Sequence, residues 1–254
     1  MRRHGVGRME LRYRATVEYD GHDFLGFQYQ ARGCTVQGEL ENAIERVAQQ
    51  RVRIVGAGRT DAGAHAIGQV IAFDVVWRHS TPDLMRALNA VLPKEIALRD
   101  CSIAHSGFHP RYDALWRRYC YTVWNEPVRS PLGQRYAHHV ADPLNVEVMR
   151  GASRCLLGSH DFGAFGQPTQ GLNTVRNVMQ AGWLASGSLL VFEITANAFL
   201  RHMVRTIVGT LLQVGRGHMK PDEIDNLVSS GVRGAAGPPA PANGLCLMKI
   251  GYAD

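Results

Sequence analysis

Residues 56–66 include the side chains of this chain best suited to chemistry. They read Gly-Ala-Gly-Arg-Thr-Asp-Ala-Gly-Ala-His-Ala, with three glycines in the first eight positions. Glycine lets the backbone turn tightly and lets a ligand approach the main chain. Arg59 and Asp61 stand near the tip of the expected turn, where a guanidinium can keep the carboxylate ionised and able to act as a nucleophile. A structural turn with a surface ion pair would contain the same residues, so this stretch alone leaves both interpretations open.

The common phosphate-binding loops do not fit this stretch. A dinucleotide fingerprint would need a third glycine at position 61, which is Asp61, and a P-loop would need Gly-Lys-Ser or Gly-Lys-Thr to follow. The chain also lacks the Gly-x-Ser-x-Gly elbow of serine hydrolases, a His-Glu-x-x-His spacing and a Cys-x-x-Cys pair. We therefore expect neither a metal nor a cofactor.

Two residues elsewhere in the chain are further candidates for a site. Arg205 lies in an apolar segment expected to be a helix over 199–214, with Arg201 four residues earlier on the same side. A buried arginine needs an anion such as Asp61, whereas an exposed one would simply point to solvent. Tyr119 lies on an expected strand, where a tyrosine can pack in the core or face a substrate.

The elements that must position these residues are strands and helices in alternation. Period-two patterns predict strands at 11–19, 52–55, 69–76, 96–104, 117–124, 175–185, 189–196 and 245–252. Helical spacing and caps predict helices from Thr35 to about 50, from a Thr81-Pro82 cap to Pro93, from an Asp142-Pro143 cap to 157, over 199–214 and over 221–230. The order of elements begins again near residue 110. We therefore expect two α+β domains, 1–110 with the Asp61 loop and 111–254 with Tyr119 and Arg205.

The composition is that of a folded protein with surplus positive charge. Of 254 residues, 45% are hydrophobic and 20% charged, which excludes a disordered chain. No apolar run approaches the roughly 20 residues of a membrane span, and the basic residues 1–8 lack the apolar core of a secretory signal. The five cysteines are an odd number and are widely spread in the sequence, so we expect reduced thiols and a cytoplasmic protein. Lys and Arg number 28 against 22 Asp and Glu, a net charge of +6 that favours an RNA partner.

Taken together, these stretches resemble the pseudouridine synthases that act on the anticodon arm of tRNA. The resemblance runs almost end to end and centres on Gly-Arg-Thr-Asp-Ala-Gly-x-His at 58–65. It also includes the stretches 19–28, 35–40, 68–70, 87–89, 92–93, 117–119, 160–162, 197–199, 203–209 and 243–245. The departures are Ala64 where valine is usual, Pro110 where alanine is common, and an Ala/Pro-rich loop at 233–242. None falls on an expected catalytic position.

The resemblance implies a fold, a substrate and a reaction. The implied fold is α+β, with two ferredoxin-like or RNA-recognition-like domains whose antiparallel sheets meet around a central active-site cleft. The implied protein is a homodimer that binds the anticodon stem-loop of tRNA and converts uridine to pseudouridine at positions 38, 39 and 40, after base flipping, without cofactor or metal. The alternatives are a non-catalytic tRNA-binding or folding protein and a pseudouridine synthase that acts on another RNA.

The resemblance also assigns roles to five residues. Asp61 matches the nucleophilic aspartate, Arg205 the arginine that pairs with it, and Tyr119 the active-site tyrosine. Arg59 matches an arginine that helps to hold the displaced base or the RNA backbone, and Leu245 an apolar residue that lines the uracil pocket. Because a tyrosine has an ordinary pKa near 10, we expect Tyr119 to stack and position first, and to act as a base only if a cation lowers that pKa.

Overall fold

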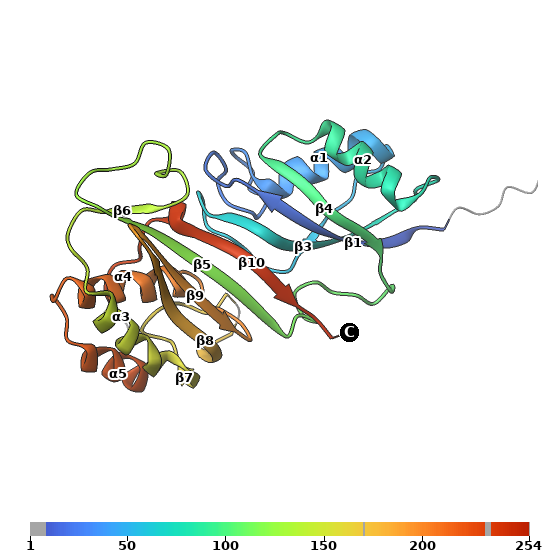
Figure 1. Ribbon diagram of the computed structural model, residues 1–254. Coiled ribbons are helices and arrows are strands. Elements are labelled where there is room, and N and C mark those ends of the chain that lie inside the picture. The colour runs from blue at the N-terminus through green and yellow to red at the C-terminus, as the bar shows by residue number, and fades with distance from the viewer. Residues whose placement is uncertain (1–8, 170, 232–234, 254) are drawn as a thin grey trace, which may run out of the picture.

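The strands of the protein form one continuous sheet in a computed structural model that describes residues 9–169, 171–231 and 235–253 (Figure 1). The strand order is β4-β1-β3-β10-β5-β9-β8-β7, with β2 paired to β3 and β6 paired to β5. The strands are β1 (Leu11–Tyr19), β2 (Val55–Gly56), β3 (His65–Val75), β4 (Ile96–Ile103), β5 (Trp116–Asn125), β6 (His138–Val140), β7 (Gly158–Asp161), β8 (Val175–Ser186), β9 (Leu189–Ala196) and β10 (Leu245–Gly251). Residues 1–8, used above to argue against a secretory signal, and part of the loop 233–242 lie outside the described residues.

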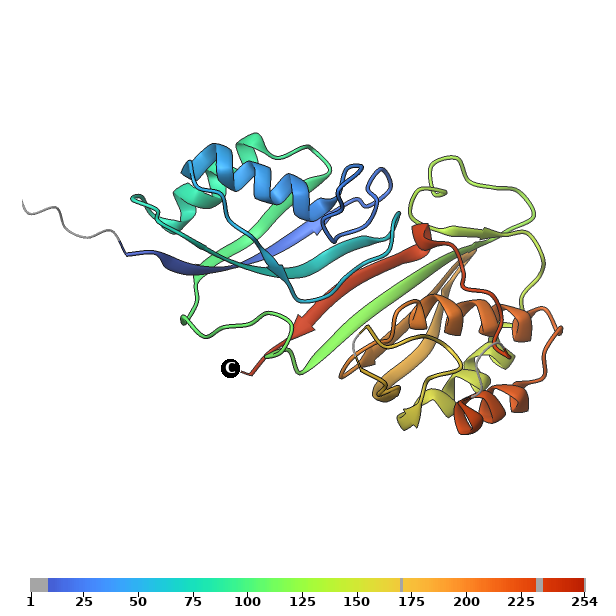
Figure 2. The ribbon, with the colours of Figure 1, turned by 180° about the vertical axis from the view of Figure 1, so that it is seen from behind.

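Two groups of helices cover the two ends of the sheet (Figures 1 and 2). Helices α1 (Val36–Ala48) and α2 (Thr81–Val91) lie over the end that contains β4, β1 and β3. Helices α3 (Val146–Ala152), α4 (Met203–Gly215) and α5 (Pro221–Ser230) lie at the end that contains β9, β8 and β7. The prediction of a mixed α+β fold with a largely antiparallel sheet is confirmed. Within the described ranges, none of the helices combines the length and the apolar character needed to cross a membrane.

The alternation of β1 shows how the sequence builds the core. Tyr13, Ala15, Val17 and Tyr19 are buried, while the residues between them are partly exposed. Successive side chains of a strand point to opposite faces, so this pattern places one face of β1 against the helices. Tyr13 stacks on Phe73 of β3 with 5.6 Å between ring centroids. The strand spans 11–19, as its sequence pattern predicts.

Strand β10 joins the first and second halves of the chain. It runs parallel to β3, with Cys246 opposite His65, and antiparallel to β5, with Leu247 opposite Tyr119. Since β3 lies in the first half of the chain and β5 in the second, the sheet crosses from one half to the other without a break. The division into domains at about residue 110 stays a prediction.

A loop from the second half is bound to the first half around His65. The segment between β5 and β6 contains Arg135 and Tyr136, which donate to Oδ2 of Asp20 at 2.5 Å and 2.9 Å. Burial lowers the pKa of His65, against the opposing effect of the nearby Asp20 carboxylate. Its Nδ1 accepts from the Gly21 N–H at 3.1 Å and lies 3.1 Å from Oδ1 of Asp20, and its Nε2 lies 3.1 Å from the Arg135 carbonyl oxygen. The histidine at the end of the glycine-rich stretch therefore contacts both halves.

The caps predicted for α2 and α3 are wrong. Helix α2 is capped by Ser80, one residue before the predicted Thr81. Helix α3 is capped by Asn145, whose Oδ1 accepts from the Val148 N–H at 3.1 Å. The predicted cap, Asp142, instead lies 2.9 Å from Nε of Arg216 at the end of α4. The helix predicted to reach 157 ends at Ala152 and continues as a 3₁₀ turn over Ser153–Leu156.

The predicted start of α4 is also wrong, with a consequence for the site. The helix begins at Met203, four residues later than expected. Residues before it are drawn into a bridge in which the Arg201 N–H donates to the Gln167 carbonyl at 2.8 Å. Arg201 therefore does not lie one helical turn before Arg205.

The remaining differences between the predicted and the observed elements concern the bounds and the number of strands. The strand predicted at 52–55 is reduced to β2, because the N–H of Ile54 binds the Glu41 carboxylate at 3.1 Å rather than a neighbouring strand. Strand β3 starts at His65, four residues before the predicted start. Strands β6 and β7, of three and four residues, were not predicted, because so few residues show no clear alternation.

Gly209 in α4 is expected to resist replacement by alanine. In a helix interior, alanine is normally favoured over glycine by about 1 kcal/mol. A methyl group on Gly209 would lie 1.8 Å from the carbonyl oxygen of Pro238. We expect Gly209→Ala to lower the free energy of unfolding by about 1–3 kcal/mol, because the loop must move away from the helix. Urea unfolding measures the change.

Gly151 of α3 provides the matched control. It is exposed, and a methyl group there would meet nothing within 4 Å. Gly151→Ala should therefore raise the free energy of unfolding by about 0.5–1 kcal/mol. Changes of the same sign in the two variants would contradict the packing of Pro238 on α4.

Candidate active site

A cleft of about 1090 Å³ contains all five residues assigned above to the site. Arg59 and Asp61 reach it from the loop before β3, Tyr119 from β5, Arg205 from α4 and Leu245 from the start of β10. Pockets of about 300–1,000 Å³ are typical of small-molecule sites. The cleft is thus large enough for a nucleotide and its neighbours.

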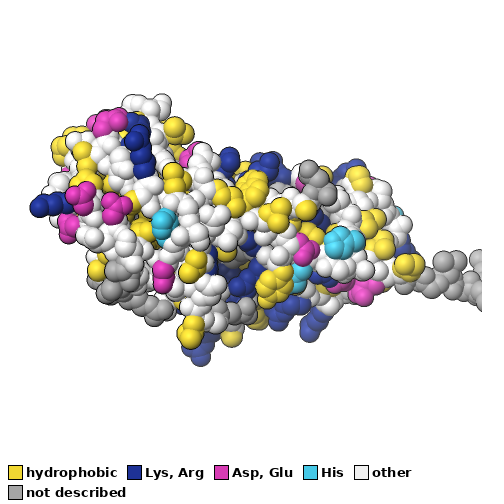
Figure 3. Space-filling view, turned by 90° about the horizontal axis from the view of Figure 1, so that it is seen from below, with side chains coloured by type: hydrophobic (Ala, Val, Ile, Leu, Met, Phe, Trp, Pro, Cys, Tyr) yellow, Lys and Arg dark blue, Asp and Glu magenta, His cyan; other side chains and the backbone are white. Residues whose placement is uncertain are grey.

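The lining of the cleft is strongly basic. Viewed from below, Lys and Arg side chains gather in and around the hollowed middle of the molecule (Figure 3). Among the described residues, one carboxylate lines the cleft, that of Asp61, together with seven arginines: Arg53, Arg59, Arg111, Arg117, Arg176, Arg201 and Arg205. A cleft lined by one sign of charge focuses its field and attracts a ligand of the opposite sign. The site is therefore suited to a polyanion.

The backbone of the Asp61 loop rests on the segment 19–28. The N–H of Phe27 donates to the Thr60 carbonyl at 3.2 Å, and the hydroxyls of Tyr19 and Thr60 lie 2.8 Å apart. Gly26 has φ = 92°, and a Cβ there would lie 2.8 Å from the Thr60 carbonyl oxygen. Only glycine fits this turn and this approach. The first stretch of the resemblance, 19–28, therefore packs against the Asp61 loop and holds its backbone in place.

Gln69 fixes the other side of the loop. Its side-chain amide donates to the Gly58 carbonyl at 2.8 Å and accepts from the Gly58 N–H at 3.3 Å. The side chain is fully buried, and a buried amide is stable only when it is hydrogen-bonded. The sequence analysis did not select Gln69 as a site residue. Its signal is a polar residue that is fully buried between the apolar side chains of β3.

Asp61 and Arg205 form the central ion pair of the cleft. Nη1 of Arg205 lies 2.7 Å from Oδ2 of Asp61, and Nε of Arg205 donates to the Ala240 carbonyl at 2.7 Å. The side chains are 26% and 18% exposed, respectively. A charge-assisted bond of this length fixes one oxygen of the carboxylate while leaving the group accessible to a ligand. The chemistry available to such a group is nucleophilic attack or proton transfer.

Tyr119 forms part of the wall beside this pair. It is 8% exposed, and its ring meets Phe199 edge-on, with 4.9 Å between centroids. Burial raises its pKa to about 12. At neutral pH the side chain is a neutral phenol, and this argues for stacking and positioning rather than proton abstraction.

Arg59 and Leu245 differ in their exposure. Arg59 is exposed and forms no ion pair with any residue that the structure describes. Its guanidinium is therefore available to a ligand. Leu245 is buried, lines the cleft and pairs with Tyr121 across β10 and β5.

Arg117 is a buried residue of the cleft that the sequence analysis did not assign to the site. Its guanidinium donates to the carbonyls of Arg111, Ala114 and Asn197 at 2.6, 3.3 and 2.7 Å. Burial lowers its pKa, and these carbonyls compensate for the missing carboxylate. It lies two residues before Tyr119 on the same face of β5, which is a signal that strand periodicity could have supplied.

His202 is a second residue that was missed. It lines the cleft, and its Nε2 lies 3.5 Å from Oδ1 of Asp61. The sequence placed it inside a predicted helix, which hid this contact. In the part of the chain that the structure describes, no three His, Cys, Asp or Glu side chains gather in a way that could hold a metal ion.

Comparison with known proteins gives consistent matches over the whole chain. The profile of a family described as "tRNA pseudouridine synthase" matches residues 15–113 and 152–253. "tRNA pseudouridine synthase A" of Syntrophotalea carbinolica is 39% identical over 241 residues, covering 94% of this chain and 96% of the relative. The protein of that name from Bacillus subtilis is 40% identical over 245 residues, covering 95% and 99%. A solved structure titled "Crystal Structure of a Cbf5-Nop10-Gar1 Complex" aligns with a TM-score of 0.37 at 11% identity, covering 94% and 50%, a likeness too weak to carry an argument.

The ion pair of Asp61 and Arg205 should be visible as an energetic coupling. Arg205→Met leaves a partly buried carboxylate and the Ala240 carbonyl without their donor, so we expect it to lower the free energy of unfolding by about 1–3 kcal/mol. In the double variant with Asp61→Asn, about 1 kcal/mol of this loss should be recovered. Urea unfolding of the four proteins measures the coupling. Strictly additive effects would show that the two side chains do not stabilise each other.

The raised pKa of Tyr119 predicts a contribution to alkaline stability. The folded state favours the neutral phenol, so its contribution is fully present below pH 10 and is lost as the pH rises through about 12. Between about pH 10 and pH 12, the free energy of unfolding should fall in both proteins, and we expect the fall to be about 1–3 kcal/mol smaller in Tyr119→Phe than in the wild type. Unfolding at a series of alkaline pH values measures the slopes. Equal slopes would mean that Tyr119 ionises at its ordinary pKa.

Proposed function

This chain belongs to the tRNA pseudouridine synthase family, and on that basis we propose that it converts uridine to pseudouridine at positions 38, 39 and 40 of the anticodon stem-loop of tRNA. Membership of the family makes the protein an isomerase that acts on tRNA. The three positions are the part of the proposal that comes from the sequence resemblance.

The observation that carries the proposal is the Asp61–Arg205 pair in a cleft otherwise lined by arginines. A nucleophilic carboxylate is useful to an RNA-modifying enzyme only if the anionic backbone can approach it. The arginines around Asp61 supply that attraction, and Arg205 holds the carboxylate among them through the 2.7 Å contact. A protein that only bound tRNA would need the arginines but not Asp61.

Access to the target base requires that it leave the helical stack. Unstacking costs a few kcal/mol, which contacts to the extruded nucleotide and to its neighbours must offset. In our proposal the exposed Arg59 contacts the RNA backbone or the space vacated by the base. Tyr119 and Leu245 form the apolar walls against which the uracil lies.

The reaction breaks the bond between C1′ and N1 of uridine and forms one between C1′ and C5. In one route, Oδ1 of Asp61 attacks C1′, and the electron pair of the C1′–N1 bond leaves with the uracil. The uracil turns, C5 attacks C1′, and the electron pair of the bond to Asp61 returns to the carboxylate. In a second route the same carboxylate takes a proton from C2′ of the ribose as the uracil leaves, which forms a C1′–C2′ double bond. C5 of the turned uracil then bonds to C1′, and the carboxylate returns the proton to C2′.

Both routes end with the same proton transfer. C5 loses its proton to a base and N1 gains one, so the product is an isomer of the substrate and no oxidant or reductant takes part. Burial raises the pKa of Tyr119 to about 12, which argues against this tyrosine as the base at neutral pH. Its proposed role is to stack against the uracil while it turns.

The proposal also includes the organisation of the protein. We infer two α+β domains, 1–110 with strands β1–β4 and 111–254 with strands β5–β10, each contributing residues to the cleft. The homodimer implied by the sequence resemblance belongs to the same proposal, and size-exclusion chromatography with light scattering tests it. A tRNA substrate requires a protein that works where tRNA is found, which favours the cytoplasm.

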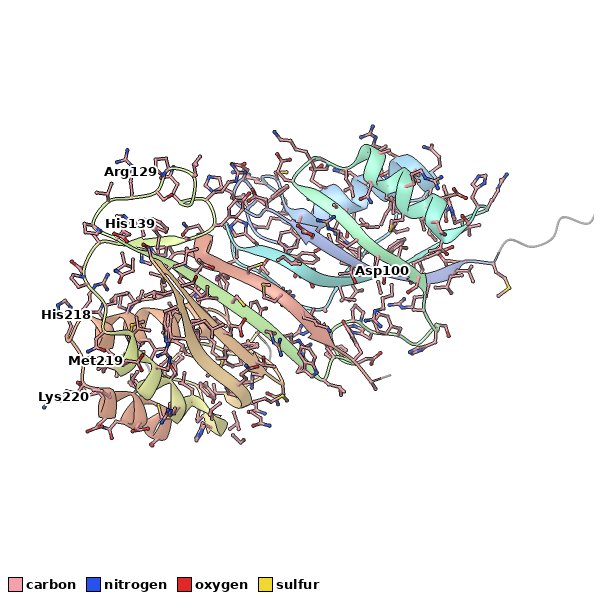
Figure 4. All side chains as sticks on the ribbon, in the orientation of Figure 1. Asp100, Arg129, His139, His218, Met219 and Lys220 are labelled. Atoms are coloured by element: carbon pink, nitrogen blue, oxygen red, sulfur yellow. The ribbon has the colours of Figure 1, made fainter. Side chains whose placement is uncertain are left out.

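The test is release of tritium from tRNA labelled at C5 of uridine. Transcripts that carry a single uridine at position 38, 39 or 40 are incubated with the wild type, with Asp61→Ala and with Asp100→Ala. Asp100 lies exposed on β4 at the edge of the sheet and does not line the cleft, so it is a matched control (Figure 4). We expect release from all three transcripts with the wild type and Asp100→Ala, and none with Asp61→Ala, which should still bind tRNA within about tenfold of the wild type.

Other outcomes separate the alternatives. Wild-type release by Asp61→Ala would remove Asp61 from the reaction. Tight binding without release from any transcript would favour the non-catalytic tRNA-binding protein, and weak binding without release would favour a synthase that acts on another RNA.

A further inference from the structure

His202, the N-cap residue of α4, has a backbone conformation that L side chains rarely adopt. Its φ is 64° and its ψ is 0°, in the left-handed region. Among the described residues, the only other non-glycine residue with a positive φ is Gln49, the C-cap of α1. Such a conformation is strained and persists only where the surroundings enforce it.

The backbone on both sides of His202 enforces the turn. Before it, the N–H of Arg201 donates to the Gln167 carbonyl at 2.8 Å, and the N–H of Gln167 donates back at 3.4 Å. After it, the His202 carbonyl accepts from the N–H of Thr206 at 2.9 Å, the first bond of the helix. The chain must therefore change from a strand-like bridge to a helix within one residue.

The result of the turn is that the imidazole lies beside Asp61. Its Nε2 is 3.5 Å from Oδ1, while Nη1 of Arg205 is 2.7 Å from Oδ2. A nitrogen thus faces each oxygen of the carboxylate. The His202 side chain is 39% exposed and lines the cleft, so it borders the space in which the substrate reacts.

A structural role does not explain a histidine at this position. Glycine adopts the left-handed conformation without strain, and asparagine adopts it with little. Among the described residues, the imidazole donates no hydrogen bond that would stabilise the fold, and its close polar neighbour is Asp61. We therefore infer that the strained backbone at His202 is retained because it places the imidazole beside the Asp61 carboxylate.

We propose that His202 is a positioning residue for Asp61. Arg205 fixes one oxygen but leaves the carboxylate able to rotate about its Cβ–Cγ bond. A second nitrogen on the other side limits that rotation and keeps Oδ1 directed into the cleft. Misplacement of a reacting atom by about 1 Å can cost about 10²-fold in rate, so this restriction has a measurable effect. The inference rests on the proposed function, in which Asp61 carries the reaction.

The test uses two substitutions that keep the backbone turn. His202→Gly removes both the strain and the imidazole, and His202→Asn keeps a short polar side chain. We expect the single-turnover rate at saturating enzyme to fall by about 10²-fold in the glycine variant and by about tenfold in the asparagine variant. The melting temperature should stay the same or rise, and the Kd for tRNA should stay within about threefold, because neither the fold nor the phosphate contacts depend on the imidazole.

Free imidazole distinguishes positioning from a purely structural effect. In His202→Gly, free imidazole can occupy the vacated space beside Asp61. We therefore expect it to raise the single-turnover rate of this variant about tenfold and to leave the wild-type rate unchanged. Gln49→Gly is the matched control, since it relieves the same kind of strain at a residue that does not line the cleft. It should raise stability without changing the rate.

The failure of this inference and the failure of the proposed function have different signatures. Full activity of Asp61→Asn would overturn the proposed function itself. An inactive Asp61→Asn together with a wild-type rate in His202→Gly would refute only the role of His202. The role of His202 would also be refuted if His202→Gly lost rate together with a lower melting temperature and did not respond to imidazole. His202→Asn then shows whether the loss of rate accompanies a loss of stability.

Discussion

The ion pair between Asp61 and Arg205 is the contact that the rest of the architecture must satisfy. The two residues are 144 positions apart, one on a loop of the first half and one on a helix of the second. Strand β10 brings the halves together by pairing with both β3 and β5. The segment 19–28 and Gln69 hold the loop from two sides, and the Ala240 carbonyl holds the guanidinium. Each of these contacts lowers the freedom of one partner, so that the backbone of the Asp61 loop and the Arg205 guanidinium are held in place around the carboxylate.

The elements that could be predicted from the sequence are those whose patterns are local. Strand β1, helix α5 and strand β9 lie where alternation, a proline or helical spacing places them. The starts of α3 and α4 were predicted wrongly because distant residues bind Asp142 and Arg201, although the cap of α3, Asn145, is itself a local signal. Asp142 binds Arg216 instead of capping α3, and Gln167 draws Arg201 out of the helix. Nothing near these positions in the chain records those partners.

The residues of the candidate site also fall into those that the sequence indicates and those that only the structure shows. Asp61, Tyr119 and Arg205 were selected because a run of motifs resembles a known family, and periodicity alone left each of them with an ordinary structural explanation. The structure adds the distances between them and the contacts of two residues that had been given no role, Gln69 and His202. Gln69 lies in the stretch 68–70 of the resemblance, but its contact with the Asp61 loop is seen only in the structure. The contact of His202 is likewise not visible in the sequence, because its left-handed turn is produced by hydrogen bonds to segments on either side.

The place of β10 in the sheet also affects how the chain can fold during synthesis. It lies between β3 and β5 but follows every other strand of the sheet in the order of the chain. A growing chain is made from its N-terminus, so β3 and β5 emerge from the ribosome with no strand to join them. Both present unpaired edges during that interval, and such edges are prone to association with other chains. Leu245 at the start of β10 also lines the cleft, so the wall of the cleft is completed only when the last strand of the chain has been inserted.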